Sequence, residues 1–129
     1  MNIPNGLWYT KTHEWVAFAG DKARVGLTDC AQETMGGIVF VSLPSVGDEV
    51  AAGGSVGEVE SVKAVSSVNS PIGGTVCAVN EALADAPETV NSAPYDAWIA
   101  ELENFGGEES AREGLLSPVQ YEAFCQEGI

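Results

Sequence analysis

Lys63 is the residue of this sequence whose type and placement best suit covalent chemistry. It is one of three lysines in the 129-residue chain, and the segment around it, 56–68, is rich in valine and serine and free of proline. This composition predicts two short strands that meet in a tight turn and leave the Lys63 amine exposed. An exposed amine can be acylated, and the amide that forms carries no charge. The alternative is a solvated turn lysine without a function.

Other residue types that could carry chemistry form no recognisable motif. His13 is the only histidine, so a zinc site with two imidazoles cannot form. Cys30, Cys77 and Cys125 are far apart in the sequence and include no Cys-x-x-Cys pair, so we expect free thiols, no disulfide framework and no metal site. The paired glycines lack the strand-loop-helix context of a phosphate-binding loop. The sequence therefore indicates no ordinary catalytic constellation.

The net charge limits the partners of the chain. Five basic and 19 acidic residues give a formal charge of −14 at pH 7. Nucleic acids and anionic membranes would be repelled at long range, so we expect neither as a partner. Proteins that bind the chain should instead carry basic patches. The alternative is that the acidity serves only solubility.

Composition and the N-terminal residues predict a folded cytoplasmic protein. Hydrophobic residues make up 45% and charged residues 19% of the chain, as in ordinary globular domains. No apolar run is long enough for a membrane span, and the first residues lack the features of a secretory signal or transit peptide. We expect a cytoplasmic location of bacterial type; the mitochondrial matrix would apply only if a transit peptide had been removed.

Apolar patterns and breaker residues divide the chain into short strands and a few helices. Its length suits a single domain, 1–129. Thr28 and Gly36 suit the start and end of a short helix between them. We predict strands at 14–19, 22–27, 38–43 and 75–79, the lysine hairpin at about 56–70, and a polar loop that begins at Asn80. The strand at 38–43 is a short, β-branched apolar run, so we expect it to be largely buried.

The C-terminal residues predict helix. Ser117, Pro118 and Gln120 form the start signal of a helix over about 118–126, and Leu116 can pack on Tyr121. A shorter helix at 108–113 precedes it, which gives a C-terminal helical segment over about 108–126. We interpret both helices as packing elements.

A weak internal repeat indicates the architecture. The strand at 37–41 resembles 74–78, the segment 47–50 is answered by 87–90, and 56–58 is answered by 98–101. Two similar sets of short strands that cannot bury their apolar faces alone predict a mainly β fold. The expected form is a flattened two-fold barrel or sandwich with short helices. The alternative is that any two β-rich halves look alike.

Several motifs together resemble one protein family. The lysine lies in the run Glu60-Ser61-Val62-Lys63-Ala64, and further motifs lie at 9–15, 25–32, 39–47, 70–74 and 90–95. From about Leu7 to Phe124, the chain resembles the H proteins of the glycine cleavage system. The resemblance implies the lipoyl/biotinyl-carrier fold, a barrel-sandwich hybrid. It also implies lipoic acid in amide linkage on Lys63, as N6-lipoyllysine.

The resemblance implies a function as well. The protein would carry an aminomethyl group from the P protein (glycine decarboxylase) to the T protein (aminomethyltransferase), and the L protein (dihydrolipoyl dehydrogenase) would reoxidise its lipoyl arm. A lipoate ligase or lipoyltransferase would attach the arm. The cofactor would do the chemistry, and the chain would be a non-catalytic carrier subunit in glycine catabolism and one-carbon metabolism.

Four other interpretations remain open. A biotin carboxyl carrier usually has methionines beside its lysine, where this chain has Val62 and Ala64. A lipoyl domain of a 2-oxo acid dehydrogenase is shorter and is tethered by an Ala/Pro-rich linker. A lipoyl carrier or relay protein could serve another lipoate-dependent complex. An enzyme with Lys63 as a Schiff-base nucleophile would need that amine desolvated or beside a cation, whereas Glu58 and Glu60 are its neighbours.

The loaded arm would need shelter on the protein between visits to its partners. Resemblance and chemistry point to Glu14, which would accept a charge-assisted hydrogen bond from the aminomethyl ammonium, with His13 beside it. The alternative is that Glu14 is a solvated strand residue and His13 a satisfied surface imidazole. The family often has acidic residues where this chain has Gly37, Ser42 and Ser67, and an acid at Ser67 would lie near the arm.

Overall fold

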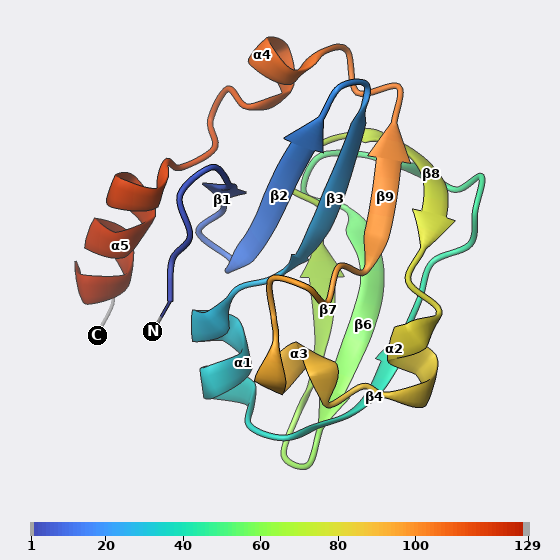
Figure 1. Cartoon of the computed structure of the whole chain (residues 1–129), viewed down its shortest axis with the longest axis vertical. Helices are drawn as coiled ribbons and strands as arrows, with labels where there is room; N and C mark the ends of the chain where they lie inside the picture. Colours follow the sequence, from blue (N-terminus) through green and yellow to red (C-terminus); the bar gives the residue numbers. More distant parts are fainter. Residues whose placement is uncertain (1, 128–129) are drawn as a thin grey trace.

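Two antiparallel β-sheets form the centre of the molecule, and short helices lie at its edges (Figure 1). This computed structural model describes residues 2–127. Its strands are β1 (Trp8–Tyr9), β2 (Glu14–Ala19), β3 (Lys22–Leu27), β4 (Ile38–Ser42), β5 (Glu49–Val50), β6 (Ser55–Ser61), β7 (Val65–Asn69), β8 (Gly74–Val79) and β9 (Ala100–Glu103). Its helices are α1 (Asp29–Met35), α2 (Ala82–Asp85), α3 (Thr89–Ser92), α4 (Glu108–Ala111) and α5 (Pro118–Glu127). Within 2–127, no helix combines the length and the apolar character needed to cross a membrane.

The strand order relates the two halves of the chain. The six-stranded sheet has the order β1-β2-β3-β9-β8-β5, and the three-stranded sheet has the order β4-β6-β7. In the first predicted repeat copy, β4 pairs with β6 in the three-stranded sheet. In the second copy, β8 pairs with β9 in the six-stranded sheet. Each copy therefore supplies one antiparallel pair, and the two pairs lie in different sheets. The predicted mainly β sandwich with a C-terminal helix is confirmed. One part of the repeat fails, because 47–50 leads into β5 whereas 87–90 leads into α3.

Inner-face side chains from both sheets bury one hydrophobic core. Val25 in β3, Leu102 in β9 and Val59 in β6 are each at most 1% exposed and belong to a single cluster. On β6, the exposed Glu58 and Glu60 flank the buried Val59. Because successive side chains of a strand point to opposite faces, burial of Val59 fixes which way the lysine hairpin faces.

Helices α1 and α5 begin with the caps predicted from the sequence. The Thr28 hydroxyl accepts a hydrogen bond from the backbone N–H of Ala31 (3.2 Å), and Gly36 ends α1 with φ 78°. At α5, the Ser117 N–H donates to the side-chain oxygen of Gln120 (2.9 Å), and the Gln120 N–H donates to the Ser117 hydroxyl (3.2 Å). These reciprocal bonds form a capping box.

The prediction that the strand at 38–43 is largely buried is wrong. Val39 is 50% exposed and Phe40 is 55% exposed, although Ile38 and Val41 are buried. The register of β4 against β6 shifts between Ile38 and Phe40, so Val39 is an extra residue in a β-bulge. A bulge turns two successive side chains away from the core, and β4 is also an edge strand of its sheet.

The prediction of a polar loop from Asn80 is wrong in part. Two four-residue helices form there, and each buries one apolar side chain, Leu83 in α2 and Val90 in α3. Helices this short offer too few residues for an apolar period to show in the sequence. Helix α4 ends at Ala111, earlier than the predicted 108–113.

Gly57 in β6 occupies a position where a side chain does not fit. Its φ is +139°, and a Cβ there would lie 2.6 Å from the carbonyl oxygen of Ser42. We expect Gly57→Ala to lower the free energy of unfolding by roughly 2–3 kcal/mol, because the backbone would be strained and β4 would have to move. Chemical denaturation measures the change. Gly37→Ala is the control, since nothing lies within 4 Å of a Cβ at Gly37; equal stabilities of the two variants would contradict this expectation.

Candidate functional site

The tip of the β6–β7 hairpin presents Lys63 on a turn that is held by Ser61. The Ser61 hydroxyl accepts hydrogen bonds from the backbone N–H groups of Lys63 (3.3 Å) and Ala64 (3.0 Å). The Ser61 N–H in turn donates to the Ala64 carbonyl oxygen (2.8 Å), and the Val62 N–H donates to the carbonyl oxygen of Gly37 (3.2 Å). Ser61 is only 5% exposed. The serine of the motif therefore shapes the turn, and the Lys63 side chain takes no part in holding it.

The Lys63 side chain is exposed and lies beside the end of α1. A Cβ added at Gly36, which ends that helix, would lie 3.6 Å from Lys63 Cε. The residues on either side of the tip are exposed as well: Val62 is 78% exposed and Val65 is 61% exposed. Within residues 2–127, the salt bridges do not include Lys63. The amine is thus accessible to an acylating enzyme.

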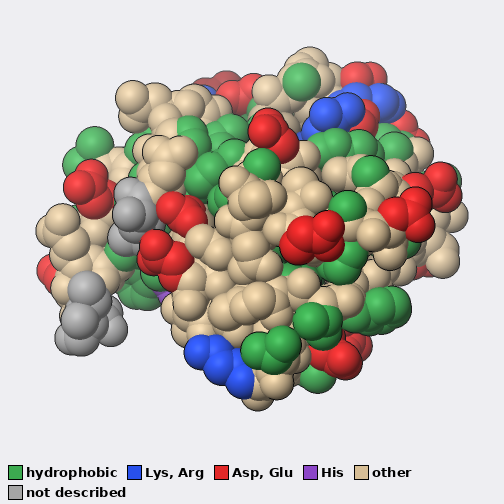
Figure 2. Space-filling model, turned by 60° about the horizontal axis from the view of Figure 1, so that its bottom comes forward, with side chains coloured by type: hydrophobic (Ala, Val, Ile, Leu, Met, Phe, Trp, Pro, Cys, Tyr) green, Lys and Arg blue, Asp and Glu red, His purple; other side chains and the backbone are tan. Residues whose placement is uncertain are grey.

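The outer face of the three-stranded sheet presents apolar and acidic side chains beside this tip. Phe40 lies opposite Glu60, and Glu60 lies opposite Val65, which makes one row across the three strands. Figure 2 shows hydrophobic side chains in a row along the lower edge of the molecule, next to a basic side chain. Exposed apolar side chains rimmed by polar ones are typical of protein-binding surfaces.

A second row on the same face contains Ser42, Glu58 and Ser67. Ser42 and Ser67 occupy two of the positions at which the resembled family often has acids. Like charges directly opposite one another destabilise a sheet, so serine on both sides leaves Glu58 without repulsion across the strands. Glu58 is therefore the carboxylate that this row offers to a partner.

Glu14 is buried at the base of the turn formed by residues 10–13, with 2% of its surface exposed. Its Oε1 accepts hydrogen bonds from the hydroxyls of Thr10 (2.6 Å) and Thr12. Its Oε2 accepts a longer bond (3.4 Å) from the backbone N–H of Asn69, at the end of β7. Burial raises the pKa of the Glu14 carboxyl above its usual value, against the opposing effect of these bonds. The alternative of a solvated strand residue is wrong for Glu14.

The His13 side chain contacts α5. Its Nδ1 lies 2.7 Å from the hydroxyl of Tyr121, and its ring packs against Phe124. Burial lowers the pKa of the His13 imidazole, which favours the neutral ring. The structure therefore links Glu14 to β7 through Asn69 and links His13 to α5. A role of either residue in sheltering the arm stays a prediction.

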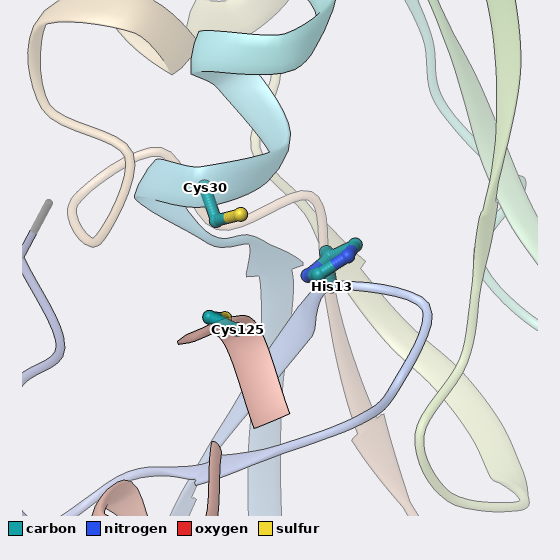
Figure 3. A group of neighbouring side chains, drawn as sticks. All are labelled: His13, Cys30 and Cys125. Carbon is teal, nitrogen blue, oxygen red and sulfur yellow. The ribbon is translucent and has the colours of Figure 1, made fainter. Parts of the chain in front are cut away.

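The structure brings together three potential metal ligands that the cysteine spacing did not indicate, so the expectation of no metal site stays a prediction. Cys30, Cys77 and Cys125 are free thiols, as predicted. However, ligand atoms of His13, Cys30 and Cys125 all lie within 4.8 Å of one another (Figure 3). The sequence did not indicate this cluster because α1 and α5, which supply the two cysteines, are far apart along the chain.

The sequence analysis also missed the contacts of Thr10 and Thr12 with Glu14. Their Thr-x-Thr-x-Glu spacing is the only sign of these contacts in the sequence.

Comparisons with known proteins agree on one family. The family model described as glycine cleavage H-protein matches residues 7–128. The glycine cleavage system H protein of Nitratidesulfovibrio vulgaris is 52% identical over 124 residues, covering 95% of this chain and 94% of the relative. That of Geobacillus kaustophilus is 52% identical over 129 residues, covering 99% and 100%. The crystal structure of the Mycobacterium marinum protein superposes with a TM-score of 0.84 at 40% identity, covering 98% of this chain and 100% of that one.

Proposed function

The chain belongs to the glycine cleavage H-protein family, and on this basis we propose that Lys63 carries lipoic acid in amide linkage. Membership of the family makes the chain the lipoyl carrier of the glycine cleavage system and makes other components of that system its partners. The observation that carries the assignment to Lys63 is its exposed amine at the tip of a hairpin whose turn is held by Ser61.

The surroundings of Lys63 fit an acylated lysine. Acylation replaces an ammonium with a neutral amide, and among the described residues no salt bridge to Lys63 would be lost. The exposed Val62 and Val65 leave space around the amine and offer an apolar surface to an alkyl arm. When bound, the lipoyl group would supply a cyclic disulfide that opens as it accepts the aminomethyl group, and the dithiol left after transfer of that group could be reoxidised.

The partners that we propose are those of the glycine cleavage cycle. The P protein would load the carrier, the T protein would unload it, the L protein would reoxidise it, and a lipoate ligase or lipoyltransferase would modify it. The chain presents the amine on a fixed hairpin, so the arm would remain at a high effective concentration within each complex. The chain itself would be a non-catalytic subunit.

Reconstitution with P, T and L proteins tests this function. The chain is lipoylated with a lipoate ligase, and intact mass confirms the addition of one lipoyl group. We expect glycine-dependent NADH formation with the lipoylated chain and none with the unmodified chain. If the lipoylated chain supports no NADH formation but supplies lipoyl groups to a 2-oxo acid dehydrogenase, the relay function is correct and the glycine cleavage function is wrong.

Binding to the P protein should weaken as salt rises. The chain carries a formal charge of −14, and the exposed Glu58 and Glu60 lie on the face beside Lys63. We expect the dissociation constant to increase by roughly tenfold between about 0.05 M and about 0.5 M salt, since screening removes attraction to a basic docking surface. Isothermal titration calorimetry at several salt concentrations measures the slope.

One double variant and one control variant make the salt experiment specific. Glu58→Gln combined with Glu60→Gln should reduce the salt slope, because both carboxylates lie beside the proposed attachment site. Glu109→Gln is the control, because Glu109 is an exposed acid on α4, at the opposite end of the molecule from the hairpin tip in Figure 1. An affinity that does not change with salt, or an equal loss of slope in the control, would count against docking through this face.

A further inference from the structure

Three metal-binding side chains meet where α1, α5 and the turn formed by residues 10–13 come together. His13 comes from the turn, Cys30 from the first turn of α1, and Cys125 from the last turns of α5. One ring nitrogen of His13 and the two sulfur atoms lie within 4.8 Å of one another. Figure 3 shows the Cys30 sulfur pointing toward the His13 ring, with Cys125 below it. The two cysteines of this cluster have no part in the carrier function proposed above.

The cluster is held in place by hydrogen bonds that pass through Tyr121. Its hydroxyl lies 2.7 Å from His13 Nδ1 and 2.7 Å from the hydroxyl of Thr28, the N-cap of α1. Its ring stacks on Tyr9, with centroids 4.7 Å apart and an angle of 7° between the planes. Tyr121 lies one helical turn before Cys125 on α5. These contacts hold the backbones that carry all three side chains close to one another.

Two thiolates and one imidazole are a ligand set that zinc prefers. Zinc binds cysteine sulfur at about 2.3 Å and histidine nitrogen at about 2.0–2.1 Å, so tetrahedral ligands lie roughly 3.4–3.8 Å apart. The separations here are at most 4.8 Å. Closure by roughly 1 Å would therefore complete three ligand positions. Rotation of side chains on α1 and α5 can supply a shift of this size.

The surroundings also suit this ion. Cys125 is 7% exposed, and the cluster lies among Tyr9, Trp15 and Phe124. A divalent cation with two thiolates and a neutral imidazole has no net charge, and such a group can be buried at little cost.

We propose that His13, Cys30 and Cys125 bind a zinc ion that joins α5 and α1 to the turn formed by residues 10–13. On binding, each thiol releases its proton to solvent, and zinc keeps its oxidation state. A water molecule would take the fourth position. Because Glu14 directly follows His13, the ion would also fix the turn that bears Thr10 and Thr12, which hold the Glu14 carboxylate.

Cobalt(II) reports on this site in the reduced, unlipoylated full chain, which lacks the lipoyl thiols. We expect one equivalent of Co²⁺ to give thiolate-to-cobalt charge transfer and the visible bands of tetrahedral cobalt, and one equivalent of Zn²⁺ to remove them. The 19 acidic residues cannot produce the charge-transfer band, because it requires sulfur ligands. Absence of this band would overturn the proposal.

The three cysteines provide matched variants. Cys30→Ser and Cys125→Ala should each weaken Co²⁺ binding by at least about a hundredfold, since even outer-shell changes cost up to that much. Cys77→Ser should bind like the parent, because Cys77 lies on β8 and its thiol donates to the Glu101 carbonyl oxygen. Near-ultraviolet circular dichroism checks that each variant is folded. Cys30 is only partly buried, so Cys30→Ser is the deciding variant if Cys125→Ala unfolds. Co²⁺ affinity equal to the parent's in Cys30→Ser, or an equal loss of Co²⁺ affinity in Cys77→Ser, would refute the site.

Discussion

Arginine in place of Lys63 is expected to abolish both lipoylation and glycine-dependent NADH formation. The guanidinium keeps its proton at any physiological pH and offers no nucleophilic lone pair to an acyl donor. The change keeps the charge and most of the length of the side chain, and the turn is held by Ser61 rather than by Lys63. We therefore expect the free energy of unfolding to change by no more than about 0.5 kcal/mol. Intact mass after incubation with lipoate ligase and a coupled NADH assay measure the two losses.

The other two lysines supply the controls for this experiment. Lys22 forms a salt bridge with Glu103 (2.6 Å) on the six-stranded sheet, and the Lys11 amine lies 5.9 Å from the centroid of the Phe124 ring. Neither lies on the hairpin, so Lys11→Arg and Lys22→Arg should be lipoylated as fully as the parent. Peptide mapping locates the group. A lipoyl group on Lys11 or Lys22, or its persistence in Lys63→Arg, would show that the attachment site is elsewhere.

Local sequence signals predicted the parts of the structure that local interactions determine. Thr28, Gly36 and Ser117 mark helix ends because their side chains or backbone freedom satisfy groups within a few residues. The valines of β6 and β7 predicted the lysine hairpin for a similar reason, since alternation along a strand follows from its own geometry. The accessibility of Lys63 could therefore be predicted before its neighbours in space were known.

Features that depend on contacts across the chain were not predicted. Exposure of Val39 and Phe40 follows from a bulge in the register between β4 and β6, which no pattern within 38–43 reveals. The Glu14 carboxylate also accepts a hydrogen bond from the backbone of Asn69, 55 residues away along the chain. The cysteine cluster depends on how α5 packs on β1 through Tyr121 and Tyr9. In each case the partner is set by sheet register or helix packing, which a single sequence does not specify.

The position of Glu14 suggests how the loaded arm would be sheltered. Asn69 lies six residues beyond Lys63, so the arm would have to lie back along β7 over roughly 20 Å of strand to reach the Glu14 carboxylate. Thr10 and Thr12 already occupy Oε1, whereas Oε2 has only the long bond from Asn69 and can accept another. An aminomethyl ammonium at Oε2 would offset the burial cost that raises the pKa of this carboxyl.

Glu14→Gln is therefore expected to speed the spontaneous release of ammonia from the aminomethyl-loaded protein by about ten- to a hundredfold. A charge-assisted hydrogen bond contributes about 1.5–3 kcal/mol, which corresponds to this range. Glutamine can keep the bonds from Thr10 and Thr12 through its carbonyl oxygen, so the turn should persist. The ratio between the variant and the parent should fall toward one as the pH drops far enough to protonate Glu14 in the loaded protein, because a protonated carboxyl no longer attracts the ammonium.

Two comparisons decide where the ammonium is held. Glu60→Gln changes an exposed carboxylate on the outer face close to Lys63, and it should leave the release rate unchanged if Glu14 is the acceptor. Unfolding the parent with denaturant gives the rate without any shelter. If unfolding speeds the release while Glu14→Gln does not, the folded protein shelters the arm through other residues. If only Glu60→Gln speeds the release, the arm rests on the outer face of the three-stranded sheet, where Phe40 and Val65 flank the Glu60 carboxylate.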